Sequence, residues 1–156
     1  MNRLNDKIFH EKILSLIEDG SIKTGRDERT LQAYIWAYLV EKIKYEKLGD
    51  EFRFKQILSV NIELYDKEGD TPDITIRKID DYKEIVLAVE IKHYIGVEIG
   101  KREENRIKKD ILSLNEKQNG IFIITVTNRE LYEPLFEEIE IMAGDKTNII
   151  IINQRK

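Results

Sequence analysis

The chain has 156 residues, of which 26 are basic and 30 are acidic, so its formal net charge is −4. It contains no cysteine and only two histidines, which excludes disulfide frameworks, cysteine-ligated metal centres, cysteine nucleophiles and sites built from several histidines. The length fits one domain, assigned to residues 1–156, and the acidic balance argues against a protein that coats nucleic acid through a global basic field.

The first part of the chain predicts two amphipathic helices. Residues 5–19 carry apolar side chains at helical spacing, and Gly20 ends this helix. Residues 27–47 form the second helix, with Asp27 as its N-cap. Its buried stripe is formed by apolar residues that recur at helical spacing: Leu31, Ile35, Tyr38 and Leu39.

Three strands follow, joined by short connections. Residues 52–65 include alternating apolar and polar side chains, which is the period of a strand with one buried face. Residues 73–78 and 84–92 form the next two strands, separated by a tight turn. Consecutive strands with short links predict an antiparallel meander.

The last third of the chain alternates helix and strand. Residues 101–117 predict a helix, and 121–127 a strand that is apolar without alternation and therefore buried on both faces. Residues 128–142 predict another helix, and 148–153 a second fully buried strand. A helix between two such strands indicates a crossover with parallel strands. The order ααβββαβαβ therefore predicts a three-layer α/β/α domain with a central mixed sheet.

Two charged residues interrupt the apolar strand 84–92. By alternation, Glu90 and Lys92 point to the same face, at the end of a strand otherwise suited to burial. Charges at that position are unfavourable unless they are paired, solvated or bound to a metal. This pair is therefore the first candidate for a functional site.

The turn before this strand brings a third charge to the pair. If Lys78 lies opposite Ile85, the register places Asp73 opposite Glu90. Directly opposite residues have Cβ atoms about 4.5–5.5 Å apart, so the two carboxylates repel each other, and a divalent cation with oxygen ligands is their natural partner. Lys92 would stand beside that cation as a point charge and hydrogen-bond donor.

A further acid comes from the helix 27–47. Glu28 lies in the first turn, on the edge of the buried stripe, and faces the sheet. Gln32, one turn later, is placed to orient Glu28 as an auxiliary residue. The helix therefore adds a third carboxylate to the predicted site.

These residues resemble the signature of the PD-(D/E)xK nuclease superfamily. Pro72-Asp73 is followed by Glu90-Ile91-Lys92 at the end of the next strand, and an acid stands in the preceding helix. The order of helix, three-strand meander, helix and strand is also typical of that superfamily. The resemblance covers about residues 24–127, and it implies the restriction-endonuclease-like fold and Mg²⁺-dependent cleavage of phosphodiester bonds, with Mn²⁺ as a substitute.

The resemblance also implies a role for each catalytic residue. Asp73 and Glu90 would bind the metal, together with the main-chain carbonyl of Ile91. Lys92 would position or activate the attacking water and stabilise the charge of the transition state. Glu28 would bind the metal directly or through water.

A purely structural interpretation of the same residues stays open. In a chain with 36% charged residues, an acid two positions before a lysine arises by chance, and positions 81–83 hold a second case. Glu90, Lys92 and Asp73 would then form an exposed salt bridge, worth about 0–1 kcal/mol. Glu28 would only stabilise the N-terminus of its helix through the helix dipole.

A basic strip on the helix 101–117 is the candidate nucleic-acid contact. Arg102, Arg106 and Lys109 share one helical stripe, and Lys101 precedes them at the start of the helix. An ordinary solvated helix face is the open alternative. The last helix is acidic, so nucleic acid is expected to avoid that side.

The expected function is a nuclease, most simply an endonuclease, whose partner is DNA rather than RNA because most families with this resemblance act on DNA. A homodimer is expected, since one site cuts one strand. Two alternatives remain open: a noncatalytic interaction or nucleic-acid-binding module on the same fold, and a subunit of a larger defence or repair complex.

Nothing in the sequence predicts a membrane partner. No apolar run approaches the roughly 20 residues that span a bilayer. The N-terminus has no apolar signal core and carries acids, so no targeting peptide is expected. A cytoplasmic location is therefore the expectation.

Overall fold

A computed structural model gives the fold of the chain. It describes residues 6–20, 27–45, 58–62, 72–78, 85–117 and 119–154. The outer parts of the predicted strand 52–65 and the second acid-lysine motif at 81–83 lie outside these residues.

The described elements follow the predicted order ααβββαβαβ, with one short 3₁₀ helix added before the last α-helix. They are α1 (Asp6–Glu18), α2 (Glu28–Tyr45), β1 (Leu58–Ile62), β2 (Ile74–Lys78), β3 (Ile85–Tyr94), α3 (Lys101–Glu116), β4 (Gly120–Val126), η2 (Arg129–Tyr132), α4 (Glu133–Ala143) and β5 (Thr147–Asn153). No helix within the described ranges is long and apolar enough to cross a membrane.

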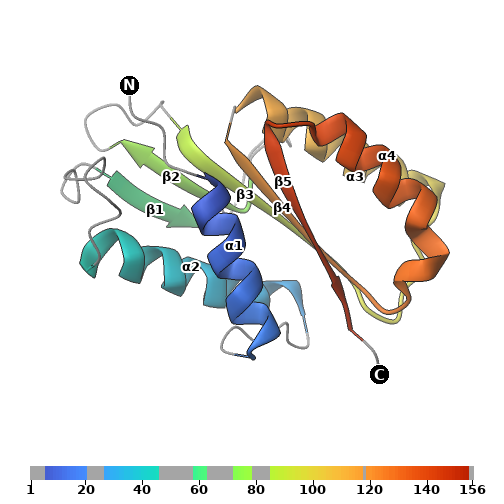
Figure 1. Ribbon diagram of the computed structural model, residues 1–156, viewed down its shortest axis with the longest axis horizontal. Helices are drawn as coiled ribbons and strands as arrows, with labels where there is room; N and C mark the ends of the chain where they lie inside the picture. Colours follow the sequence, from blue (N-terminus) through green and yellow to red (C-terminus); the bar gives the residue numbers. More distant parts are fainter. Residues whose placement is uncertain are drawn as a thin grey trace.

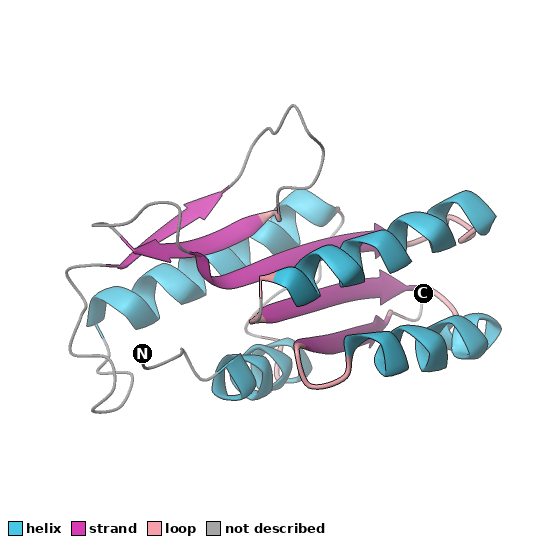
Figure 2. Cartoon of the chain, turned by 90° about the horizontal axis from the view of Figure 1, so that it is seen from above, coloured by secondary structure: helices cyan, strands magenta, loops and turns pink. Residues whose placement is uncertain are grey.

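The five strands form one mixed sheet in the order β1-β2-β3-β4-β5, and Figure 2 shows them side by side. β1 pairs with β2 and β2 with β3 in antiparallel fashion. β3 pairs with β4 and β4 with β5 in parallel fashion. The α/β class, the antiparallel meander and the parallel crossover are therefore confirmed.

Helices cover both faces of this sheet, as Figure 1 shows. On one face, Leu87, Val89 and Ile91 of β3 pack in a core with the buried residues of α1 and α2. On the other face, Ala88 packs in a second core with the buried residues of α3 and α4. All seven residues of β4 are buried, because both layers cover this central strand. The arrangement has three layers.

Local signals set the ends of the first two helices as predicted. The backbone N–H of Thr30 donates to Asp27 Oδ1 at 2.8 Å, which is the hydrogen bond of an N-cap. Gly20 follows α1 with a φ of 80°, a conformation that favours glycine. The predicted stripe residues Leu31, Ile35 and Leu39 are fully buried.

The last strand differs from its prediction. The segment 148–153 was expected to be buried throughout, but in β5 only Thr147 and Ile150 are buried. The reason is its position, since β5 is an edge strand of the sheet. An apolar run does not distinguish a central strand from a partly buried edge strand, whose side chains here pack into both cores.

The helix predicted for 128–142 is divided in two. Asn128 precedes η2 and makes no capping hydrogen bond with its side chain. α4 begins only at Glu133, with Pro134 in its first turn. Proline has no backbone N–H and is tolerated only at the start of an α-helix, so Pro134 sets this boundary.

The central position of β4 gives a first prediction. Ile123 is fully buried, whereas Ile141 on α4 is 82% exposed. We expect Ile123→Ala to lower the free energy of unfolding by about 2–5 kcal/mol, because it leaves a cavity in the core. Urea denaturation measures this loss. The same change at Ile141 is the control and should stay within about 0.5 kcal/mol of the wild type; equal losses at the two positions would contradict the assigned core.

Candidate active site

The pairing of β2 with β3 places Asp73 as the sequence predicts. Ile74 lies opposite Val89, and the two following pairs keep this register. Continuing the register by one residue brings Asp73 to the position opposite Glu90. The two carboxylates therefore belong to neighbouring strands at the same level of the sheet.

The predicted pairing at the other end of β2 is wrong. Lys78 was expected opposite Ile85, but Arg77 lies there, and the register shifts between Ile76 and Arg77. A β-bulge of this kind adds one residue on one strand. The predicted pairing of Asp73 with Glu90 is unaffected, because the bulge lies at the other end of β2 from Asp73.

β3 continues past the start of β2, and acidic side chains form hydrogen bonds with its backbone there. The N–H of Ala88 bonds to Asn119, on the β4 side, so the N–H groups of Ile91 and His93 point to the β2 side. The Ile91 N–H donates to Asp73 Oδ2 at 2.7 Å. In a strand, the C=O of a residue points the same way as its N–H, so the Ile91 carbonyl faces the Asp73 side too.

Glu28 reaches the same edge from α2. A hydrogen bond with the backbone of His93 acts on its carboxylate, and so do the charges of Asp73 and Lys92. The side-chain amide of Gln32 donates to the main-chain oxygen of Asp73 at 3.1 Å. Gln32 was expected to orient Glu28, but the hydrogen bond that the structure gives it fixes the start of β2.

Lys92 lies between two carboxylates. Its Nζ atom is 3.3 Å from Glu90 Oε1 and 3.3 Å from Asp110 Oδ2. Asp110 belongs to α3, which covers the face of the sheet to which Glu90 and Lys92 point. The structure therefore brings Glu28, Asp73, Glu90 and Lys92 together, as predicted, and adds Asp110.

The electrostatics of the acids are governed first by burial. Burial, followed by the charge of Asp73, raises the pKa of Glu90 to about 8. Burial also raises the pKa of Asp73, although the Ile91 hydrogen bond and the charge of Lys92 oppose this. The pKa of Glu28 is raised by burial and then by Asp73.

For the ammonium of Lys92, the effect of neighbouring charges on the pKa outweighs the effect of burial. Burial lowers its pKa, but the charges of Glu90 and Asp110 raise it by more, so the pKa of Lys92 lies above its ordinary value. The charged form of Lys92 is therefore favoured in this arrangement.

The donor set fits a hard divalent cation with few protein ligands. Among the described residues, no group of three or more Asp, Glu, His or Cys side chains is placed to hold a metal ion. Mg²⁺ needs only one or two carboxylates, with water in its remaining positions. Asp73 and Glu90 supply two carboxylates and the Ile91 carbonyl a neutral oxygen, and a cation would relieve the repulsion between the two partly buried carboxylates. Glu28 as a direct ligand stays a prediction.

The predicted basic strip lies on the exposed side of α3. Lys101, Arg102, Arg106 and Lys109 are all exposed. Arg106 is one turn from Asp110, and such residues are neighbours on a helix surface. Lys101 is turned by about 100° from Arg102 around the helix axis, so it does not share the stripe of the other three.

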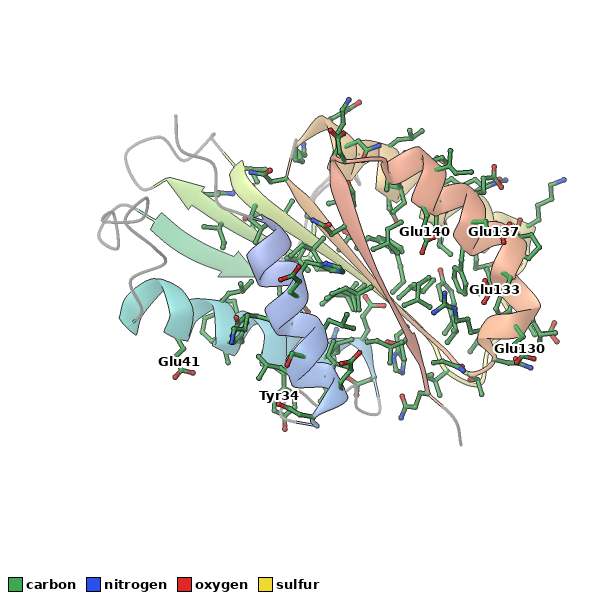
Figure 3. The ribbon with its side chains drawn as sticks, in the orientation of Figure 1. Tyr34, Glu41, Glu130, Glu133, Glu137 and Glu140 are labelled. Carbon is green, nitrogen blue, oxygen red and sulfur yellow. The ribbon has the colours of Figure 1, made fainter. Side chains whose placement is uncertain are left out.

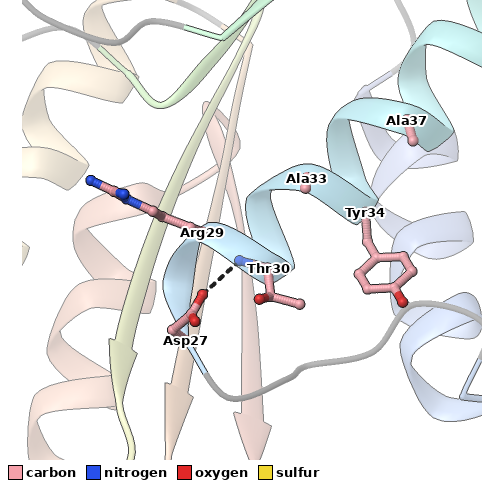
Figure 4. A pocket seen from close by; sticks show the side chains of 6 residues that line it. All are labelled: Asp27, Arg29, Thr30, Ala33, Tyr34 and Ala37. Atoms are coloured by element: carbon pink, nitrogen blue, oxygen red, sulfur yellow. Dashed lines mark hydrogen bonds between the residues drawn. The ribbon is translucent and has the colours of Figure 1, made fainter.

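Two other surface features do not include the acids of the candidate site. A cavity of about 480 Å³ is lined by Asp27, Arg29, Thr30, Ala33, Tyr34 and Ala37, and Figure 4 shows these residues along one side of α2. That side is opposite to the stripe that carries Glu28. Figure 3 shows Glu130, Glu133, Glu137 and Glu140 along η2 and α4, which gives this surface the acidic character that the sequence predicts.

Two residues of the site were not predicted. Tyr94 is half-buried, and its pKa is raised by burial and influenced next by the charge of Lys92. Alternation along β3 places Tyr94 on the face of Glu90 and Lys92, but the predicted strand ended at residue 92. Asp110 flanks the buried stripe of α3 formed by Ile107, Ile111 and Leu114, a helical signal that could have indicated a side chain turned towards the sheet.

The raised pKa of Glu90 predicts how stability depends on pH. An acid whose pKa is higher in the folded state contributes stability that is complete below its ordinary pKa of 4.5 and lost as the pH rises towards 8. In the absence of divalent cations, we expect the free energy of unfolding to fall over this interval, at most by about 1.4 kcal/mol per pH unit for one proton. Denaturant titrations at several pH values measure the slope.

Glu90→Gln should remove much of that slope, because glutamine does not titrate. Asp73, Lys92 and Asp110 also act on Glu90, and the raised pKa of Asp73 leaves a residual slope. Glu137→Gln on the exposed side of α4 is the matched control and should keep the wild-type slope. An unchanged slope in Glu90→Gln would show that Glu90 is not the group that titrates.

Comparison of the chain with models of protein families gives no match, and neither curated proteins nor solved structures give one.

Proposed function

We propose that this protein is a Mg²⁺-dependent nuclease of the PD-(D/E)xK type, with the restriction-endonuclease-like fold, and that it hydrolyses phosphodiester bonds in DNA. The coarse architecture is compatible with that fold. The order of the elements and the mixed sheet with an antiparallel meander followed by parallel strands agree with the expectation from the sequence motif.

One observation carries the proposal: two partly buried carboxylates and one ammonium meet where β3 extends past the start of β2. Asp73 bonds to the backbone of Ile91 at 2.7 Å, and Glu90 lies 3.3 Å from Lys92. The raised pKa values of both acids indicate negative charge that lacks sufficient compensation. Perturbed pKa values of this kind cluster at functional sites.

Each residue has a chemical task in this proposal. A bound Mg²⁺ supplies positive charge to the phosphate and lowers the pKa of water. Asp73 and Glu90 would hold that cation, with the Ile91 carbonyl as a neutral oxygen donor. Lys92 would donate hydrogen bonds to the nonbridging phosphate oxygens and stabilise the negative charge that grows in the transition state. Glu28 would accept a hydrogen bond from water at the site.

Nucleic acid is the proposed partner because the basic strip lies beside these acids, and DNA is proposed over RNA because most families with this resemblance act on DNA. Arg106 is one turn from Asp110, and Arg102 is one turn further along the exposed side of α3. Such cations contact phosphates and position a strand without reading its sequence. The acidic surface of η2 and α4 would repel the same strand.

One observation favours the alternative of a noncatalytic module. Lys92 is already paired with both Glu90 and Asp110, so part of the negative charge is neutralised without a cation. Calorimetric titration with Mg²⁺ and Mn²⁺ separates the two functions. The nuclease requires that the wild type binds the cation and that Asp73→Ala abolishes this binding. A noncatalytic module would show no cation binding in either the wild type or the variant.

The direct test is a cleavage assay on single-stranded, duplex and branched DNA and on RNA, with Mg²⁺ or Mn²⁺. We expect cleavage of DNA that ends when the cation is chelated. Lys92→Ala should lower the rate at saturating cation by about 10²–10³-fold, because it removes one stabiliser of the transition state. Asp73→Ala and Glu90→Ala should abolish cleavage, because each removes one of the two carboxylates proposed to hold the cation.

Lys146→Ala is the matched control for Lys92→Ala. Lys146 is exposed in the turn before β5 and carries the same charge. It should keep the wild-type rate. Equal rates for the Lys92 and Lys146 variants would remove Lys92 from the proposed site.

The basic strip is tested by the salt dependence of binding. The double variant Arg102→Ala and Arg106→Ala should bind DNA more weakly, and the slope of log Kd against log salt concentration should flatten by about 1–2 units, since each lost phosphate contact removes about 0.9. Fluorescence anisotropy at several salt concentrations measures the slope.

A second double variant controls for net charge. Lys12→Ala and Lys146→Ala remove two exposed cations from α1 and from the turn before β5. This variant should keep a slope close to that of the wild type. Equal flattening in both double variants would show that only the overall charge matters.

A further inference from the structure

Asp110 forms a second ion pair with the Lys92 ammonium, in addition to that of Glu90. Both carboxylates lie 3.3 Å from Lys92 Nζ, and the three side chains are 13–26% exposed. Asp110 Oδ2 is buried and accepts no well-formed hydrogen bond within the described part of the chain. A buried carboxylate oxygen is unfavourable unless a charge neutralises it, and the ammonium of Lys92 fills that role.

The position of Asp110 is set by the core. α3 buries Ile107, Ile111 and Leu114 against the sheet. Asp110 lies between the first two of these anchors and flanks the buried stripe. Its carboxylate is therefore held by a packed helix, whereas Lys92 ends a flexible side chain with considerable rotamer freedom.

Glu90 and Asp110 are not equivalent once the site binds a cation. In the proposed nuclease, Glu90 would help to hold the divalent cation, and the charge of that cation would repel the nearby ammonium. Glu28 also attracts Lys92, but more weakly than Asp110 does. Asp110 is then the carboxylate that still keeps the ammonium in the site.

We propose that Asp110 is the positioning residue of Lys92, which holds its ammonium beside the cation and the scissile phosphate during cleavage. This inference rests on the proposed nuclease function, and it assigns to α3 a part in catalysis that the sequence motif does not contain. Asp110 acts through Lys92 and touches neither the cation nor the substrate.

The test uses the isosteric variant Asp110→Asn, which keeps the shape of the side chain and removes its charge. In steady-state cleavage of DNA at a Mg²⁺ concentration that saturates the wild type, kcat should fall about 10- to 100-fold, since a displaced catalytic group loses rate by such factors. KM should stay within about twofold of the wild type, as expected for a group that acts in the transition state. Asp110→Glu should restore part of the rate.

A second measurement follows Lys92 without any need for cleavage. The rate at which a lysine-selective acylating reagent modifies Lys92, read by mass spectrometry, should rise severalfold in Asp110→Asn because the ammonium loses one of its two partners. Lys108, which pairs with Glu138 at 2.9 Å, is the internal control and should react at its wild-type rate. Circular dichroism confirms that the variant is folded.

Glu116→Gln is the matched charge control on the same helix. Glu116 is exposed, and it lies about 9 Å along the helix axis from Asp110. It should leave both the cleavage rate and the acylation of Lys92 unchanged. An effect equal to that of Asp110→Asn would mean that any lost charge on α3 suffices, and the proposal would fail.

Three other outcomes overturn the proposal: an unchanged kcat in Asp110→Asn, an unchanged acylation rate of Lys92, or a loss that higher Mg²⁺ concentrations fully restore. The last outcome would assign Asp110 to the cation rather than to Lys92. A wild-type protein that cleaves no nucleic acid would refute the proposed function, and the acylation experiment would then decide separately whether Asp110 places the ammonium.

Discussion

The candidate site depends on a difference in length between two neighbouring strands. β2 begins at Ile74, whereas β3 runs on to Tyr94. Beyond the start of β2, the N–H groups of Ile91 and His93 point to a side where the described sheet offers no strand, and buried backbone donors need a partner. The Asp73 carboxylate accepts a hydrogen bond from the Ile91 N–H, and Glu28 interacts with the backbone of His93. The requirement of the backbone for hydrogen bonds thus gathers acids that would otherwise repel each other.

The same gathering creates an electrostatic conflict among the acids. Neither hydrophobic core includes any of these charged residues. Yet Glu28, Asp73 and Glu90 all have raised pKa values, with burial as the first cause. Lys92 is the cation that compensates them, and it is shared with Asp110. Conflicts of this kind, which work against stability, are expected where a protein binds a ligand or performs chemistry.

Much of this arrangement follows from the sequence because it rests on short-range periodicity. Alternation along β3 and the helical stripe of α2 indicated which faces carry Glu90, Lys92 and Glu28. Features set by tertiary context were missed. The bulge after Ile76 and the edge position of β5 depend on neighbours that a single strand does not reveal. Asp110 was missed for the same reason, since its contact with Lys92 depends on how α3 crosses the sheet.

Ile91, which lies between Glu90 and Lys92 in the motif, explains why the site can be held in a fixed geometry. The side chain of Ile91 is fully buried in the core beneath α1 and α2, while the side chains on either side of it face α3. The backbone that bonds to Asp73 is therefore fixed from one layer, and the ammonium of Lys92 is held from the other. Because Asp110 and Arg106 are one turn apart on α3, the position of this one helix sets both the place of the ammonium and the place of a basic residue beside it. A shift of α3 against β3 would displace both together, so the position of the basic strip and the charge arrangement at the site are mechanically linked.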